Sequence, residues 1–324
     1  MITRALCAAT LMLAVNPSFA TTWDEPWQRT IVQRSTTLGL YEVKSVDGGK
    51  AVLTRKKHLA GEETPPEITT NGYTLLHLTS SSSEVSPMWV GVGAQFYFFL
   101  EKDGPASWKL PTPSSGSDYR KSDTVVHATY AISMQKASID AATYELTQTC
   151  IFNVAHHQLC DRGPLDAFIK KNLALPPVAM GEKTPPDEAQ RFFAQHAALE
   201  TATAIGYTVA AADIDQFINS PSVFQQMSGL RYRAVNQGER GQFSFAAFVC
   251  DPTKVPLARQ YALLLMTEHD MRNEATALKK CVARLKATDG GQSLVNIMDQ
   301  RIGTRFPSRL QDEAMLLLKK WDRN

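Results

Sequence analysis

The hydrophobic pattern of this 324-residue chain changes once, near residue 160, and the change limits the fold more than any other feature. Before it, runs rich in Thr, Val, Tyr and Phe are separated by turn residues such as Asp47-Gly48-Gly49 and Asp103-Gly104-Pro105, which is typical of strands and hairpins. After it, apolar residues recur at about the 3.6-residue period of amphipathic helices. The sequence therefore predicts an α+β protein in which a small β-barrel or sandwich precedes an all-α region.

We expect three segments: a signal peptide over residues 1–20, a β-rich, barrel-like domain over residues 21–161 and an α-helical, solenoid-like domain over residues 162–324. The boundary between the last two is predicted in Cys160–Pro164. Its Gly163-Pro164 pair cannot continue a β-ladder and is expected to break the last β-segment.

The helix that starts within Thr184–Glu188 and ends at Gly206 has the clearest ends. Thr184 supplies a capping hydroxyl, Pro185 and Pro186 fit a first turn, and Gly206 ends the pattern. The expected strands are Thr30–Val46, Ala51–Lys57, Gly72–Thr79, Gln95–Glu101, Val125–Met134 and Thr143–Ile151, with loops at Ser80–Ser86 and Leu110–Ser117. Further helices are expected from near Leu165 and over Ile214–Asn219, Pro221–Val235, Phe243–Val249, Pro256–Thr267, Arg272–Lys286, Gln292–Ile302 and Pro307–Trp321. Short links between them favour antiparallel helix hairpins.

The first twenty residues have the three parts of a cleavable signal peptide. Arg4 supplies the positive charge, Leu6–Val15 an apolar run, and Ser18-Phe19-Ala20 the small residues before the cut, so Thr21 is the expected mature start. The run is shorter than the roughly 18 residues that cross a bilayer, which makes a retained anchor the weaker reading. We expect a periplasmic or secreted protein with no integral membrane segment after cleavage.

Four cysteines remain after cleavage: Cys150, Cys160, Cys250 and Cys281. An even number in an exported chain favours disulfides over free buried thiols. Of the three possible connectivities, the local one agrees best with the predicted domains: Cys150 with Cys160, and Cys250 with Cys281. The second pair is expected to join the end of one helix to the next helix but one.

The charge balance limits the partners. The formal charge is +2, and removal of Arg4 makes it +1. A net charge so near zero provides no strong attraction for a polyphosphate, so we expect no nucleic-acid partner.

The first half resembles the netrin-like, TIMP-like module, an OB-type β-barrel. The resemblance rests on Arg34–Val43, on the β-run that ends in Lys56–Gly61 and on Gly91–Leu100. The second half is similar to HEAT-like repeats, notably at Phe217–Gln226. The inhibitors of the netrin-like family use an N-terminal cysteine, whereas this chain is expected to begin at Thr21, so inhibition of metalloproteases does not follow from the resemblance.

The sequence holds no His-Glu-x-x-His, no Gly-x-Ser-x-Gly, no phosphate-binding Gly-rich loop and no Cys-x-x-Cys. No catalytic residue, cofactor or metal site is predicted. Ser133-Met134-Gln135-Lys136 matches the Ser-x-x-Lys of penicillin-recognising enzymes, but it lies in β-like sequence. Asp213-Ile214-Asp215 resembles the start of a calcium loop, yet Ile218 stands where that loop needs glycine, so helix-entry acids are favoured.

The adjacent His156 and His157 lie between two cysteines, which admits a metal site, but we favour surface histidines in a disulfide-closed loop. Arg231-Tyr232-Arg233, with Arg240, is either a cationic patch for acidic partners or the solvated rim of a helix, and the rim is favoured.

Taken together, these observations favour an exported, non-enzymatic interaction or scaffold protein that binds a protein partner in the cell envelope. The alternatives are an envelope hydrolase with scattered residues, for which His127, His156 and Asp161 are the candidates, and a module that binds a small ligand or peptidoglycan. The oligomeric state is left open.

Overall fold

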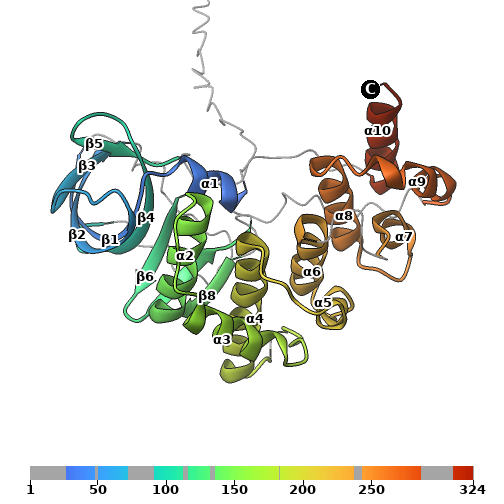
Figure 1. The fold of residues 1–324 in the computed structure, drawn as a ribbon, viewed down its shortest axis with the longest axis horizontal. Helices are drawn as coiled ribbons and strands as arrows, with labels where there is room; N and C mark the ends of the chain where they lie inside the picture. The colour runs from blue at the N-terminus through green and yellow to red at the C-terminus, as the bar shows by residue number, and fades with distance from the viewer. Residues whose placement is uncertain are drawn as a thin grey trace, which may run out of the picture.

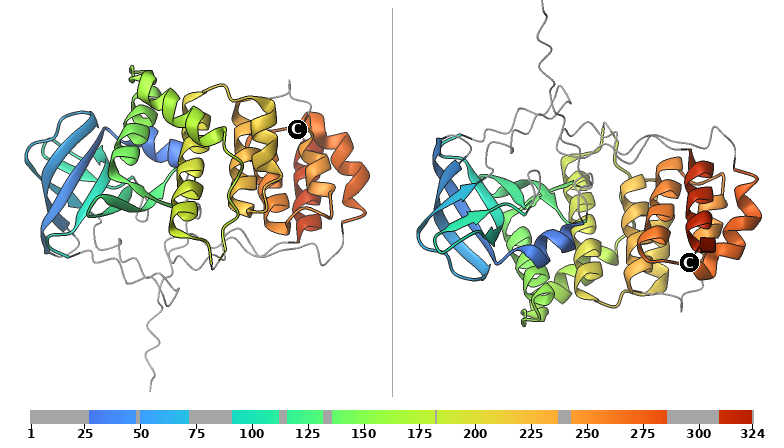
Figure 2. Two further views of the ribbon diagram at one scale, coloured as in Figure 1. Left: turned by 90° about the horizontal axis from the view of Figure 1, so that it is seen from below. Right: turned by 90° about the horizontal axis from the view of Figure 1, so that it is seen from above.

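The computed structural model describes residues 27–47, 50–71, 91–111, 116–131, 136–181, 183–236, 243–285 and 309–323. They form an elongated molecule with a β-barrel at one end and a row of helices leading away from it (Figures 1 and 2). Several predicted segments lie outside these residues: the signal peptide, the strand Gly72–Thr79, the loop Ser80–Ser86 and the helix Gln292–Ile302.

The strands form one eight-stranded sheet in the order β1-β2-β3-β5-β4-β6-β7-β8. Their bounds are β1 Thr37–Asp47, β2 Lys50–Gly61, β3 Glu67–Asn71, β4 Gln95–Lys102, β5 Ser107–Lys109, β6 Ser117–Lys121, β7 Thr124–Thr129 and β8 Lys136–Asp140. An additional antiparallel pairing of β1 with β4 closes the first five strands into a barrel. The pair β3–β5 is parallel. The predicted small barrel is confirmed.

Strand β4 is buried on both faces, which its continuous apolar sequence requires. Phe96, Phe98 and Leu100 point into the barrel, where they join a core that includes Tyr41 and Trp108. The alternate residues Tyr97 and Phe99 belong to a second core outside the barrel. The Tyr97 ring lies 4.5 Å from that of Tyr144, and the Phe99 ring 6.5 Å from that of Phe152. A helix therefore covers this side of the barrel.

That covering helix, α2 (Ala141–Ala155), occupies the segment Thr143–Ile151, and the prediction of a strand there is wrong. Asp140 ends β8 and caps the helix, accepting a hydrogen bond from the Thr143 backbone nitrogen at 2.7 Å. Thr and Tyr favour strands locally, but helical spacing places Tyr144 and Ile151 against the barrel, and this packing outweighs the propensity.

The start of the first predicted strand, Thr30–Val46, is also corrected. Helix α1 (Gln28–Arg34) comes first, and β1 begins only at Thr37. Helix α1 lies between the barrel and the row of helices (Figure 1).

Gly163-Pro164 does not end a β-segment, because α2 already precedes it. It lies in the first turn of α3 (Arg162–Leu173), which begins before the predicted Leu165. Proline is tolerated there since the first turn lacks intrahelical partners for its backbone N–H groups. Asp161 caps this helix, accepting from the Gly163 nitrogen at 3.1 Å.

The remaining helices confirm an all-α region after the barrel. Their bounds are α4 Pro186–Ile205, α5 Ala211–Ile218, α6 Val223–Asn236, α7 Phe245–Cys250, α8 Pro256–Glu268, a 3-10 turn at Arg272–Glu274, α9 Ala275–Val282 and α10 Leu310–Arg323. Gly206 ends α4, as predicted, and it adopts the left-handed conformation at φ 66°. Thr184 does not cap that helix, because its hydroxyl accepts from the Gly181 nitrogen instead.

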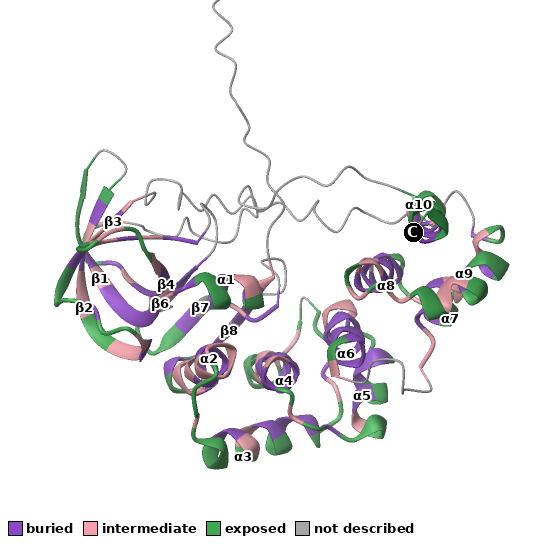
Figure 3. Ribbon diagram, turned by 45° about the horizontal axis from the view of Figure 1, so that its top comes forward, coloured by how far each residue is buried: buried purple, intermediate pink, exposed green. Residues whose placement is uncertain are grey.

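The helices stack as pairs in two rows. Helices α2, α4, α6, α8 and α10 follow one another in an arc, with α3, α5, α7 and α9 on its outer side and α1 on its inner side (Figure 3). Each outer helix packs on the inner helix that follows it, as expected for hairpins. The core is continuous from the outer face of the barrel to α10.

Candidate functional site

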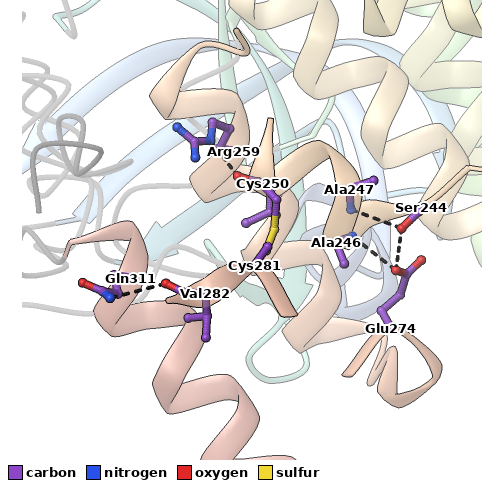
Figure 4. Close-up of a disulfide and its surroundings, with 10 residues drawn as sticks. Ser244, Ala246, Ala247, Cys250, Arg259, Glu274, Cys281, Val282 and Gln311 are labelled. Carbon is purple, nitrogen blue, oxygen red and sulfur yellow. Dashed lines mark hydrogen bonds between the residues drawn. A yellow bond between two sulfur atoms is a disulfide. The ribbon is translucent and has the colours of Figure 1, made fainter. Parts of the chain in front are cut away.

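The cysteines pair locally, in the predicted connectivity. The Cα atoms of Cys150 and Cys160 lie 5.1 Å apart, and those of Cys250 and Cys281 lie 5.9 Å apart. The second disulfide joins the last residue of α7 to α9, the next helix but one in the chain (Figure 4).

The surroundings of the second disulfide are held by polar contacts (Figure 4). The carboxylate of Glu274 accepts from the Ser244 hydroxyl at 2.8 Å and from the Ala246 nitrogen at 3.3 Å, which places a negative charge at the start of α7. Arg259 Nε donates to the Val249 carbonyl at 2.6 Å. These contacts explain the local geometry without a ligand.

The histidines of the first disulfide loop face in different directions. His156 is half-buried, stacks on Phe152 with 4.4 Å between ring centroids, and lies 3.0 Å from the Val32 carbonyl through Nε2. His157 is exposed and has φ 58°. Leu159, also in the loop, is 95% exposed.

The other sequence candidates have structural surroundings or lie outside the described residues. Asp161 caps α3, and His127 lies in β7. Lys136 begins β8, while Ser133 lies outside the described part of the chain. Asp213 lies in the first turn of α5, as expected of a helix-entry acid.

The favoured interpretation of Arg231-Tyr232-Arg233 as a solvated helix rim is wrong. Arg231 is 4% and Arg233 7% exposed. Arg231 pairs with the fully buried Glu200 of α4, and Arg233 Nη2 lies 2.6 Å from an oxygen of Asp215 in α5. Charge on α6 is buried because partners on two neighbouring helices compensate it. Arg240 lies outside the described residues.

Arg231 lies at the inner side of the arc, where residues at the start of α1 contact α6 and α8. The Arg231 guanidinium lies over the Trp27 ring at 5.3 Å from its centroid, and the same ring lies 6.0 Å from that of Tyr261 in α8. Arg29 Nη2 lies 3.8 Å from a carboxylate oxygen of Glu268. We call these five residues, Trp27, Arg29, Arg231, Tyr261 and Glu268, the latch.

A small open depression adjoins the latch, with Val235 of α6 and Leu265 and His269 of the α8 end in its lining, and its cavity volume is only about 10 Å³. Small-molecule pockets are usually about 300–1,000 Å³ and enclose most of their ligand. The depression suits the edge of an extended contact better than an enclosed small molecule. Burial, with Arg29 nearby, lowers the pKa of His269 and keeps its imidazole neutral near pH 7.

A buried His–Ser pair lies deeper in the helical row. His196 Nδ1 of α4 is 3.1 Å from the Ser228 hydroxyl of α6, and the His196 ring is approached edge-on by Tyr130. The pair resembles half of a nucleophilic dyad. His196 is only 4% and Ser228 1% exposed, so substrate cannot reach the hydroxyl in this conformation.

The barrel surface is neutralised by ion pairs between neighbouring elements. They are Arg34–Glu101, Lys44–Glu67, Arg55–Glu63, Lys56–Glu42, Lys57–Glu145, Lys102–Glu62 and Lys109–Asp103. A surface on which most cations are paired with acids in this way offers little net attraction to a polyanion.

The latch was not predicted from the sequence. Trp27 and Arg29 stand just before a predicted strand, and their partners lie more than two hundred residues later in the chain. The sequence feature that could have indicated it was the pair Arg231 and Arg233, two cations on a helix that was expected to bury one face.

Among the described residues, none of the helices has the length and apolar content of a membrane span, and no three His, Cys, Asp or Glu side chains are grouped so that they could hold a metal ion. No protein-family model, no curated protein and no solved structure matches this chain.

Proposed function

We propose that this protein is an exported, non-enzymatic scaffold that binds a protein partner in the cell envelope. The inner side of the helical arc carries this proposal. Paired helices stacked into an arc expose an extended inner surface, and such surfaces usually bind other proteins. The sequence around residues 1–20 and the four cysteines support export.

We further propose that the barrel is netrin-like, that the helix pairs are HEAT-like and that the chain divides functionally into residues 21–161 and 162–324. The OB-type strand order supports the first assignment, and the two rows of helices support the second. The neutralised barrel surface favours a protein over a nucleic-acid partner. The depression beside the latch is too small to enclose a small ligand at that place.

The test is affinity capture from an envelope extract with the full chain as bait, followed by titration of the purified partner. Two matched variants locate the binding surface: Val235→Asp, on the inner side of the arc, and Val92→Asp, at the barrel. The two side chains are 39% and 66% exposed, so neither variant disturbs the core. We expect Val235→Asp to weaken binding about tenfold or more, as loss of a central interface contact does, and Val92→Asp to leave it unchanged.

If the wild type, Val235→Asp and Val92→Asp bound the partner equally well, the inner side of the arc would not be the binding surface. Failure to capture any partner, together with stoichiometric labelling of a serine by a reactive probe, would favour the hydrolase alternative instead.

A further inference from the structure

Helix α10 is the last helix of the inner row and lies at the end of the molecule away from the barrel (Figures 1 and 2). One face of α10 packs on α8 and α9. Its buried residues recur at helical spacing and are Leu310, Ala314, Leu317, Leu318 and Trp321. The opposite face of the helix therefore points away from the core of the row.

That opposite face is apolar at its centre. At about 3.6 residues per turn, it carries Asp312, Met315, Leu316, Lys319 and Arg323. Met315 is 47% and Leu316 65% exposed. The helix that ends a stack of helix pairs usually has a polar outer face, because no further pair covers it. Two adjacent exposed apolar side chains at this position indicate that another surface covers them.

The charges on the same face are ordered along the helix. Asp312 lies one turn before the apolar pair, and Lys319 lies one turn after it. Both side chains are exposed, and neither forms an ion pair with another described residue. Reversing the direction of the helix exchanges the acid and the cation while the apolar pair stays in the middle. The face is therefore complementary to an antiparallel copy of itself.

We propose that this face of α10 is the interface of a homodimer, in which α10 packs antiparallel on the same helix of a second copy about a two-fold axis. Met315 then contacts Leu316 of the partner subunit, and Asp312 pairs with Lys319 of the partner subunit. The two-fold axis forms each of these contacts twice. The dimer goes beyond the proposed function and does not depend on it.

The size of the face determines how strong the dimer is. A helix of fourteen residues is about 21 Å long, so one pair of such helices buries less than the roughly 1,600 Å² of a standard interface. The apolar centre supplies the affinity, and the charges at the two ends mainly select the antiparallel register. We expect a weak, reversible dimer whose population rises with protein concentration.

The test is the molar mass of the purified protein in solution, measured by sedimentation equilibrium from about 1 µM to about 1 mM, the range of weak affinities. The mass should rise from that of one chain to that of two. Leu316→Asp places a charge at the centre of the interface and should raise the dissociation constant about tenfold or more. Leu159→Asp is the matched control and should dimerise as the wild type does, because Leu159 is an exposed leucine in the first disulfide loop, away from α10.

A mixture of two charge-reversal variants tests the antiparallel register. Asp312→Lys alone places two cations opposite each other at each end of the interface, and Lys319→Asp alone places two acids there. Each variant should dimerise more weakly than the wild type. In an equal mixture, a heterodimer of the two variants again has one acid and one cation at each end, so the mixture should recover the affinity of the wild type. A general loss of folding would not be repaired by mixing.

The mass of one chain at every concentration would overturn the proposal, and so would equal dimerisation by the wild type and Leu316→Asp. A mixture that dimerises no better than either charge variant alone would contradict the antiparallel register. Circular dichroism checks that the variants are folded, and if Leu316→Asp is not, Met315→Asp makes the same test at the other apolar position. A monomer whose binding to vesicles of anionic phospholipid is lost in Leu316→Asp would assign the face to a membrane surface and would also overturn the dimer.

Discussion

The barrel and the helical row treat charged side chains in opposite ways. On the barrel, the side chains of Lys44 and Glu67 pair across strands while remaining 55% and 49% exposed. Between α4 and α6, those of Arg231 and Glu200 are 5% and 0% exposed. Water can replace either partner of the first pair, whereas removal of one partner of the second leaves a buried charge uncompensated. The helical row is therefore the region in which charge controls stability.

The same contrast holds for neutral polar groups. Gln195, 0% exposed in α4, donates to the Leu175 and Pro176 carbonyls, each at 3.0 Å, and accepts from the Gln225 side chain at 3.0 Å. It ties the α3–α4 connection to α6. The barrel interior, by comparison, is filled mainly by aromatic and aliphatic side chains such as Phe96 and Phe98.

The largest expected effect comes from breaking the buried pair. Arg231→Met should lower the free energy of unfolding by about 3–5 kcal/mol, because it leaves the Glu200 carboxylate buried without its cation. Urea denaturation of wild type and variant measures the difference. The double variant Glu200→Leu/Arg231→Met is the control and should recover most of the loss. A single-variant cost below about 1 kcal/mol would contradict the contrast between the two regions.

The next effect concerns the disulfide between α7 and α9. Replacing both Cys250 and Cys281 with serine should cost about 3.5 kcal/mol, from the entropy gained by the unfolded chain when this loop is opened. The matching change at Cys150 and Cys160 opens a shorter loop and should cost about 2.5 kcal/mol. Thermal or urea unfolding of both double variants under oxidising conditions measures the two losses of stability. A larger loss for the Cys150 and Cys160 variant would show that contacts in the native state outweigh the length of the closed loop.

A small effect is expected on the barrel. Lys44→Ala should change the free energy of unfolding by less than about 0.5 kcal/mol, since both side chains of its ion pair are about half exposed. The measurement is the same urea titration, at low and at high salt. A loss of about 2 kcal/mol or more would show that ion pairs of the barrel stabilise the protein as strongly as the buried pair of the helices, and would contradict the contrast between the two regions.

The smallest expected effect is a pH dependence at His269, beside the latch. Burial lowers the pKa of His269, so below about pH 6.5, the usual pKa of histidine, the unfolded chain takes up this proton before the folded chain does. The stability contributed by neutral His269 is thus present above that pH and lost as the pH falls towards the folded pKa. Between pH 8 and pH 5.5, the free energy of unfolding should decrease more for the wild type than for His269→Gln. Equal decreases for the two proteins would contradict this prediction.

Local patterns predicted much of the fold and little of the site. The run Phe96–Leu100 identified a strand, and the helices from Pro186 to Arg323 have the expected period where the structure describes them. Thr143–Ile151 was mispredicted because its Thr and Tyr favour strands, while the capping by Asp140 and the barrel surface it covers stabilise a helix. Burial of Arg231 could not be predicted, because it depends on Glu200 lying opposite on another helix.

The order of the two regions, the helical period and the local cysteine pairs follow from the amino-acid sequence, because each depends on residues near one another in the chain. Closure of the barrel by β1 and β4, the burial of Arg231 and the contact of Trp27 with Tyr261 do not. They depend on which distant surfaces meet, and long-range pairing is settled by the packing of the whole chain rather than by local preference.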